Sequence, residues 1–372
     1  MSLTKRVVIK IGSSSLTSQS GDISRRKLEN LTDQVAELKD QGHEVLLVSS
    51  GAVAAGYRTL GFVNRPDSLP EKQAAASVGQ GRLIETYSEL FSSHGYAASQ
   101  ILITRSDFSE EKRYNNVRNT INVLLERGIV PIVNENDTVT TDRLCFGDND
   151  TLSAKVAGLA AADQLIILSD IDGLYNADPR KDSSAELLEK VSEITEDIED
   201  MAGEPGSDVG TGGMRSKIDA FKISMASGIP SFLGRSGVDN ILVEAVNETA
   251  TGTYFTCKES DPNLDHKRQW IAFNSGPEGE ITIEEEARHA IVDDKTHLLP
   301  SQVYQINGHF DKGSVVHIKD VNGTKLGLGK MNYSSEDLAK FQMRKTQDPS
   351  QEAVMNSEAF VCELEIAIPV GV

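Results

Sequence analysis

Two lysines that lie beside glycines are the residues of this chain best suited to chemistry on a phosphate group. Lys10 belongs to the apolar stretch VVIKI (7–11) and precedes Gly12 and three serines, and Lys217 closes the segment GTGGMRSK (210–217). An ammonium group supplies positive charge, and glycine lets backbone N–H groups approach phosphate oxygens. Taken alone, Lys10 also fits a strand-end lysine that reaches for water, and 210–217 a flexible turn. Converging from two loops, the lysines would form a phosphate site.

Carboxylates and amides follow in two short motifs, NEND (134–137) and GDND (147–150). Such residues often cap helices and form turns. Together they offer enough polar groups to hold an ammonium and orient a small charged metabolite. A hydroxyl at a helix N-terminus would also favour a carboxylate. The candidate metabolite-binding residues are Ser50, Gly51, Asn134, Asp137, Asp148, Asn149 and Asp150.

Several common sites are missing from the sequence. It contains neither a G-x-x-x-x-G-K-[ST] phosphate loop nor a strand-linked G-x-G-x-x-G dinucleotide motif. The 3 cysteines and 7 histidines are scattered without metal-ligand spacing. We therefore expect no protein-bound metal site and no disulfide framework, and the cysteine usage suits a reducing cytosol.

The elements that must position these residues follow from apolar patterning. Short apolar runs at 7–11, 45–49, 101–104, 129–133 and 165–169 predict buried strands, and helical patterns at 24–40, 120–126, 151–161 and 218–226 separate or follow them. This alternation predicts an α/β fold with a mostly parallel open sheet sandwiched by helices. Lys10 would end a strand at the edge where such sheets bind ligands.

The pattern of apolar and polar residues changes after residue 258. The stretch 258–268 is polar and contains Pro262, and short strand patterns follow at 280–283, 302–307, 314–319 and 325–328. We expect an α/β domain over 1–258, a linker over 259–275, a small β-rich domain over 276–356 and a C-terminal tail over 357–372.

Charge and composition limit the partners. The 372 residues carry 37 Lys+Arg and 56 Asp+Glu, a formal net charge of −19, which disfavours nucleic acids and anionic membrane surfaces. At 38% hydrophobic and 25% charged residues the chain reads as globular. No apolar run is long enough to cross a membrane, so we expect a soluble cytoplasmic protein.

Six motifs, in this order and spacing, resemble those of the glutamate 5-kinases of the amino-acid kinase superfamily: VVIKIGSSSL, VSSGAVAAG, IVPIVNENDTV, FGDNDTLSA, LSDIDGLYNADPR and GTGGMRSK. The β-rich part resembles the PUA domain found behind this kinase. The resemblance implies an amino-acid kinase fold and ATP-dependent phosphorylation of the γ-carboxylate of L-glutamate, the first step of proline synthesis.

The resemblance also implies roles for individual residues. Lys10 and Lys217 would neutralise charge on the transferring phosphoryl group. Ser50, Asp137 and Asn149 would contact glutamate, with Gly51, Asn134, Asp148 and Asp150 close by. The nucleotide-binding residues would be Lys10, Ser169, Asp170, Thr211, Gly212, Gly213, Met214, Arg215, Ser216 and Lys217.

Further properties follow from the resemblance alone. The family uses Mg²⁺, here expected to bind through ATP phosphates, is inhibited by proline and commonly forms homo-oligomers. Its acyl phosphate product hydrolyses readily, which suggests either a closed site or hand-over to the next proline-pathway enzyme. Two departures stand out: Ser216 occupies a position where the family usually has threonine, and residues 361–372 lack the usual closing sequence.

Two rival functions remain at this point. Other kinases of the superfamily act on aspartate, N-acetylglutamate, carbamate or a nucleoside monophosphate. An RNA-binding regulator is the second rival, because PUA domains often contact RNA. Residues 276–356 hold 9 basic against 13 acidic residues, without the basic excess usual for RNA binding, so we expect no RNA partner.

Overall fold

The computed structural model describes residues 4–18, 22–140, 148–179, 181–201, 213–257, 264–344 and 352–366. It divides into two compact units, one formed by Met1–Asp107 and Lys112–Asp261 and the other by Phe108–Glu111 and Pro262–Val372. Each unit contains its own β-sheet. Among the described residues, no helix is long and apolar enough to span a membrane.

The first unit is built on an eight-stranded sheet in the order β3-β4-β2-β1-β5-β7-β8-β6. All neighbours pair in parallel except β7 and β8. The expected mostly parallel sheet is therefore confirmed. Its strands are β1 Arg6–Ile11, β2 Glu44–Val48, β3 Ala98–Ile103, β4 Val130–Glu135, β5 Gln164–Ser169, β6 Lys190–Val191, β7 Ser231–Arg235 and β8 Thr253–Phe255.

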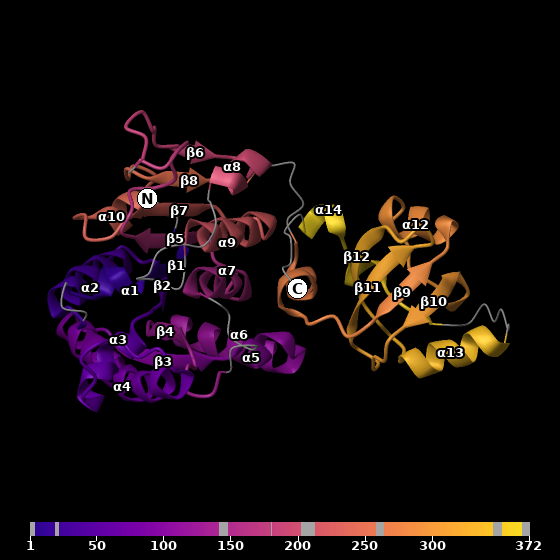
Figure 1. Ribbon diagram of the computed structural model, residues 1–372, viewed down its shortest axis with the longest axis horizontal. Helices are drawn as coiled ribbons and strands as arrows, with labels where there is room; N and C mark the ends of the chain where they lie inside the picture. The colour runs from indigo at the N-terminus through magenta and orange to yellow at the C-terminus, as the bar shows by residue number, and fades with distance from the viewer. Residues whose placement is uncertain are drawn as a thin grey trace. The chain divides into compact units, whose positions relative to one another are not determined.

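Helices cover both faces of this sheet (Figure 1). Apolar side chains of α2, α4 and α10 form one buried cluster with Val7, Ile9 and Ile11 of β1. The other face of β1 meets α7, which packs against α9. The helices before residue 250 are α1 Ser13–Leu16, α2 Arg25–Asp40, α3 Ala52–Gly56, α4 Leu69–Ser93, α5 Arg105–Ser109, α6 Glu111–Glu126, α7 Asn149–Leu159, α8 Glu196–Met201, α9 Met214–Ala226 and α10 Ile241–Val246, with a 3₁₀ turn at Tyr57–Leu60.

The second unit has a five-stranded sheet in the order β10-β9-β11-β12-β13. These strands are β9 Glu280–Ile283, β10 Val303–Asn307, β11 Val315–Asp320, β12 Lys325–Lys330 and β13 Phe360–Cys362. Its helical elements are α11 His266–Gln269, a π turn at Trp270–Asn274, α12 Glu285–Val292, α13 Ser335–Arg344 and α14 Glu363–Ile366, with 3₁₀ turns at Pro300–Gln302 and Ser357–Ala359.

Two stretches expected to be a linker and a tail contain ordered elements. Within 259–275, helix α11 is capped by Asp265, whose carboxylate accepts from the Arg268 N–H at 2.9 Å, and the following Trp270 is buried. Within 357–372, β13 pairs with β12 and extends the second sheet.

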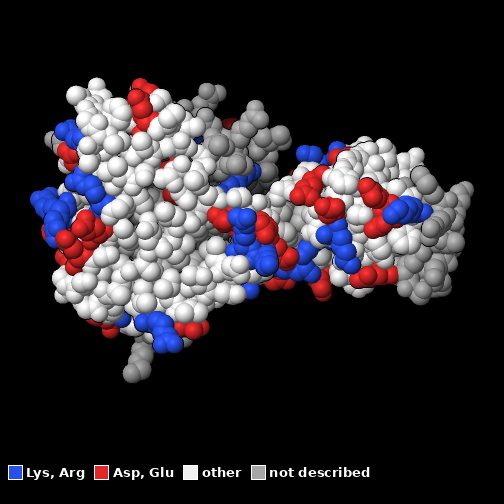
Figure 2. All heavy atoms as spheres, turned by 90° about the horizontal axis from the view of Figure 1, so that it is seen from below, with Lys and Arg blue, Asp and Glu red and all other residues white. Residues whose placement is uncertain are grey.

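On the face drawn in Figure 2, lysine and arginine side chains lie next to aspartate and glutamate. Opposite charges therefore partly compensate one another on this face.

Candidate functional site

Lys10 points to the α7 side of the first sheet because side chains alternate along a strand. Ile9 and Ile11 join the apolar cluster on the opposite face, so Lys10 faces the N-terminus of α7. It is only 6% exposed and forms an ion pair with Asp150. A Cβ on Gly12 would lie 3.6 Å from Lys10 Nζ, so the backbone of this loop passes close to the ammonium group.

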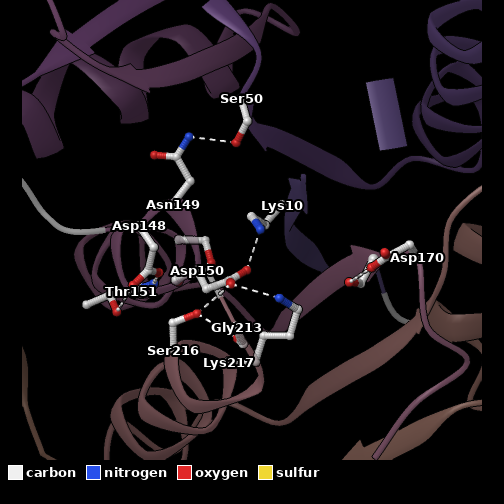
Figure 3. Close-up of polar contacts among 12 residues, drawn as sticks. Lys10, Ser50, Asp148, Asn149, Asp150, Thr151, Asp170, Gly213, Ser216 and Lys217 are labelled. Atoms are coloured by element: carbon white, nitrogen blue, oxygen red, sulfur yellow. Dashed lines mark hydrogen bonds and ion pairs between the residues drawn. The ribbon is translucent and has the colours of Figure 1, made fainter. Parts of the chain in front are cut away.

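Asp150 brings the two candidate lysines together (Figure 3). Its Oδ1 pairs with Lys10 Nζ, and its Oδ2 lies 3.1 Å from Lys217 Nζ. Ser216 Oγ also donates to Oδ2 at 3.1 Å. Lys10 and Lys217 thus converge from β1 and α9 on one fully buried carboxylate.

The charges of this cluster stabilise one another. Burial alone would raise the pKa of Asp150, but the ammonium groups of Lys10 and Lys217 hold that pKa below its ordinary value. The carboxylate therefore stays ionised at neutral pH. Two ammonium groups therefore lie close together at the carboxyl end of the sheet, where both can bind oxygens of an anionic group.

Helix α7 begins at the GDND motif, and Asp148 is its N-cap. Asp148 Oδ1 accepts from the Thr151 N–H at 2.8 Å. Burial and the adjacent Asp150 carboxylate raise the pKa of Asp148 to about 6. This capping aspartate is therefore partly protonated at mildly acidic pH.

Asn149 lies where the ends of β2 and β4 meet α7. Its Nδ2 donates to Ser49 O and Ser50 Oγ, both at 2.8 Å, and to Asn134 Oδ1 at 3.2 Å. Gly51 follows with a φ of 97°, in the left-handed region that glycine adopts most readily, and α3 begins directly after it. The site thus brings Ser50, Asn134 and Asn149 together.

Two residues that the sequence analysis did not single out support this group from α4. Gln80 Oε1 accepts from Asn134 Nδ2 at 2.9 Å, and Tyr87 OH lies 3.0 Å from Ser49 Oγ. The small-residue run AAASVGQG around Gln80 is the only signal in the sequence, and it indicates close helix packing rather than a polar contact.

Asp137 lies in the turn after β4, and within the described part of the chain no hydrogen bond joins it to Asn149 or Ser50. Burial raises the pKa of Asp137 above its ordinary value, and the Arg65 guanidinium opposes that shift. This carboxylate therefore costs free energy to keep ionised without a positive partner.

The candidate nucleotide residues lie on two elements. At the end of β5, Ser169 Oγ donates to Asp170 Oδ1 at 3.1 Å, and Figure 3 shows no marked contact from Asp170 to the lysines. Gly213 is the N-cap of α9, which starts at Met214. Arg215 donates to Glu199 of α8 at 3.1 Å. Thr211 and Gly212 lie outside the described residues.

Within the described ranges, no group of three or more histidine, cysteine, aspartate or glutamate side chains could hold a metal ion. Both oxygens of Asp150 face ammonium groups. A hard cation such as Mg²⁺ commonly keeps several waters and binds through substrate phosphates with one or two carboxylates. The donors present fit that mode better than a full protein cage.

Comparison with known proteins identifies the class. Residues 5–234 match the sequence model of the amino acid kinase family, and residues 279–352 match the PUA domain. The chain is 64% identical to glutamate 5-kinase 2 of Bacillus licheniformis over 98% of both chains. It is 61% identical to glutamate 5-kinase 2 of Bacillus subtilis, over 99% of this chain and 98% of that one.

These matches define a phosphotransferase of the kinase type with a PUA domain. The chain belongs to the amino acid kinase family and, within it, to the glutamate 5-kinases. Among solved structures, carbamate kinase from Giardia lamblia bound to AMP-PNP matches with a TM-score of 0.51 at 18% identity, over 69% of this chain and all of that one. That likeness supports the fold of the first unit.

Proposed function

We propose that this protein transfers the γ-phosphoryl group of ATP to the γ-carboxylate of L-glutamate. The observation that carries the proposal is the convergence of Lys10 and Lys217 on Asp150, next to the amide and hydroxyl groups of Asn149 and Ser50. The relatives named glutamate 5-kinase support the choice of acceptor.

The reaction needs no general base. With a reference pKa of about 4.3, the γ-carboxylate is ionised at neutral pH and is itself the nucleophile. One of its oxygens attacks the γ-phosphorus, and the bond to the β–γ bridging oxygen breaks, releasing ADP with the electron pair. Positioning and charge stabilisation remain as the protein's tasks.

Lys10 and Lys217 supply that charge stabilisation. Asp150 holds both ammonium groups and keeps them from repelling one another before substrates bind. Ser169, Asp170 and the segment Thr211, Gly212, Gly213, Met214, Arg215 and Ser216 are the proposed nucleotide contacts. Mg²⁺ bound to the ATP phosphates would reduce the charge on the γ-phosphoryl group.

The acceptor side uses the polar groups around α7. Ser50, Asp137 and Asn149 are proposed to bind glutamate, with Gly51, Asn134, Asp148 and Asp150 shaping the site. Asp137 would pair with the substrate ammonium, which would offset the cost of its buried charge. The α-carboxylate would be favoured near the Ser50 hydroxyl, just before α3 begins.

Four properties of the family extend the proposal. Proline keeps the amino-acid head group, so it would compete with glutamate at these residues as a feedback inhibitor. We also propose a cytoplasmic homo-oligomer, and a product passed to the next enzyme of proline biosynthesis. We also propose the domain limits expected from the sequence: a kinase domain over 1–258, a linker over 259–275, a PUA-like domain over 276–356 and a tail over 357–372.

The test is ADP release from Mg·ATP and L-glutamate, with hydroxylamine present to trap the acyl phosphate as a hydroxamate. Hydroxamate should form with glutamate and not with aspartate or N-acetylglutamate. Folded protein that makes no hydroxamate with glutamate would refute the proposed reaction, and hydroxamate from another acceptor would refute the proposed substrate.

A further inference from the structure

Gln80 is a buried polar side chain that contacts the candidate site from a helix outside it. It belongs to α4, is 8% exposed, and its Oε1 accepts from Asn134 Nδ2 at 2.9 Å. Asn134 is itself 2% exposed at the carboxyl end of β4. A buried amide N–H₂ without an acceptor costs free energy. The hydrogen bond to Gln80 therefore favours the orientation of Asn134 in which its Nδ2 faces α4.

The contacts of Asn134 all require the same orientation. Its Oδ1 accepts from the Glu135 N–H at 2.9 Å and from Asn149 Nδ2 at 3.2 Å, while its Nδ2 donates to Gln80. A flip of this amide would place Nδ2 against two donors and Oδ1 against the acceptor of Gln80. Gln80 therefore helps to select the orientation in which Asn134 offers an acceptor to Asn149.

The orientation of Asn134 in turn determines the orientation of the Asn149 amide at the proposed glutamate site. Its Nδ2 faces three acceptors, Ser49 O, Ser50 Oγ and Asn134 Oδ1. Its own Oδ1 then points away from Ser50, as Figure 3 shows. A carbonyl oxygen in that position accepts hydrogen bonds, which suits the ammonium group of an amino acid.

The same helix supports the other side of the group. Tyr87, about two helical turns after Gln80, lies with its hydroxyl 3.0 Å from Ser49 Oγ, and both side chains are fully buried. Close packing fixes α4 against α3: a Cβ on Gly79 would come within 1.8 Å of Ala52 O. Gln80 thus projects from a helix that packs closely against the element following Ser50.

We propose that Gln80 is a positioning residue for the amino-acid acceptor: by holding Asn134, it sets the amide orientation of Asn149 and with it the affinity for the substrate ammonium. This inference rests on the proposed function, because it assumes that the amino acid binds beside Asn149. It assigns Gln80 no contact with the transferring phosphoryl group.

The test compares Gln80→Met with Gln34→Met in the full-length protein. Methionine has nearly the length of glutamine and no amide. Gln34 of α2 is a matched control because it is also buried, with 6% of its surface exposed. Its Oε1 accepts from the Leu242 N–H of α10 at 3.0 Å, on the face of the sheet opposite to Lys10. Both variants lose a buried hydrogen bond, and only one lies beside the site.

We expect Gln80→Met to raise the glutamate KM about tenfold or more, the effect of one lost buried hydrogen bond on binding. Its ATP KM and kcat should change less than threefold, and Gln34→Met should leave all three near wild type. An unchanged glutamate KM in Gln80→Met, or an equal rise in Gln34→Met, would overturn the proposal. If Gln80→Met does not fold, Gln80→Ala takes its place with the same expected result.

A double-mutant cycle tests whether Gln80 acts through Asn134. The double variant Gln80→Met/Asn134→Ala should show the glutamate KM of Asn134→Ala alone, because the second substitution removes the group that Gln80 holds. If the two substitutions instead raised the glutamate KM by the product of their separate effects, Gln80 would not act through Asn134. If wild type forms no hydroxamate from glutamate, the proposed function fails; if wild type is active and the variants behave otherwise than expected, only the Gln80 inference fails.

Discussion

Asp150 Oδ2 lies 3.1 Å from Lys217 Nζ, and neither side chain is more than 7% exposed. The other oxygen of this carboxylate pairs with Lys10. Lys10 and Lys217 are more than 200 positions apart in the chain, and the parallel sheet brings them together because strand β1 and helix α9 both meet α7. One carboxylate therefore sets the spacing of two positive charges before any phosphate arrives.

Removal of either lysine should slow phosphoryl transfer. We expect Lys10→Ala and Lys217→Ala to lower kcat by about 10²–10³, the usual effect of losing one preorganised charge-stabilising group. Steady-state kinetics with Mg·ATP and glutamate would measure this. Lys5→Ala is the control: Lys5 precedes the other end of β1 and donates to Val246 O at 2.8 Å. A kcat near wild type in either site variant would remove that lysine from the mechanism.

Much of this arrangement could be predicted from the sequence. Buried strands of parallel sheets are nearly continuous apolar runs, so a lysine within one, as in VVIKI, stands out. Asp150 was harder to interpret, because an aspartate at the start of a helix is usually a cap or a favourable first-turn charge. Its role as the shared partner of two lysines depends on tertiary contacts that no local pattern encodes.

The contribution of α4 was not predicted. Gln80 and Asn134 are 54 positions apart, and the hydrogen bond between them leaves no periodic signal. The helix itself gives a weak amphipathic pattern because it packs against α3 through alanine and glycine instead of large apolar side chains. Helix contacts of that kind become visible only when the backbones are seen to approach each other.

Glutamate affinity should fall as the pH is lowered, and earlier than for an exposed aspartate. The ionised form of Asp137 is the one that pairs with an ammonium, and burial raises its pKa above the ordinary value. The glutamate KM should therefore rise below neutral pH. Arg65 opposes the shift, so Arg65→Gln should move this rise to higher pH. KM measured between about pH 5 and 8 would show both effects; identical profiles in wild type and Arg65→Gln would contradict this account.

Asp148→Asn should stabilise the protein at neutral pH but not at acid pH. The folded-state pKa of Asp148 is raised to about 6, so between its unfolded value and 6 the folded state binds more protons. Stability from this group is therefore lost as pH rises through that window. Asparagine caps helices about as well and carries no charge. We expect the variant to gain on the order of 1–3 kcal/mol at pH 7.5.

Thermal unfolding at pH 4.5 and 7.5 would measure that difference. The Tm of Asp148→Asn should exceed the wild-type Tm at pH 7.5, and the two values should approach each other at pH 4.5. Asp163→Asn is a control: this aspartate accepts from the Arg6 N–H at 2.6 Å but caps no helix at the site. A Tm difference for Asp148→Asn that is the same at both pH values would show that the charge of Asp148 does not matter to folding.

Gly79→Ala and Gly81→Ala should have opposite effects, although the two glycines are two positions apart in α4. A Cβ on Gly79 would lie 1.8 Å from Ala52 O, a backbone atom of α3 that cannot move aside, whereas a Cβ on Gly81 meets nothing within 4 Å. We expect Gly79→Ala to lose about 1–3 kcal/mol of unfolding free energy or more, because the helices must separate. Gly81→Ala should gain about 0.5–1 kcal/mol from alanine's higher helix propensity. Denaturant unfolding would measure both, and a stabilised Gly79→Ala would show that α3 and α4 do not pack this closely.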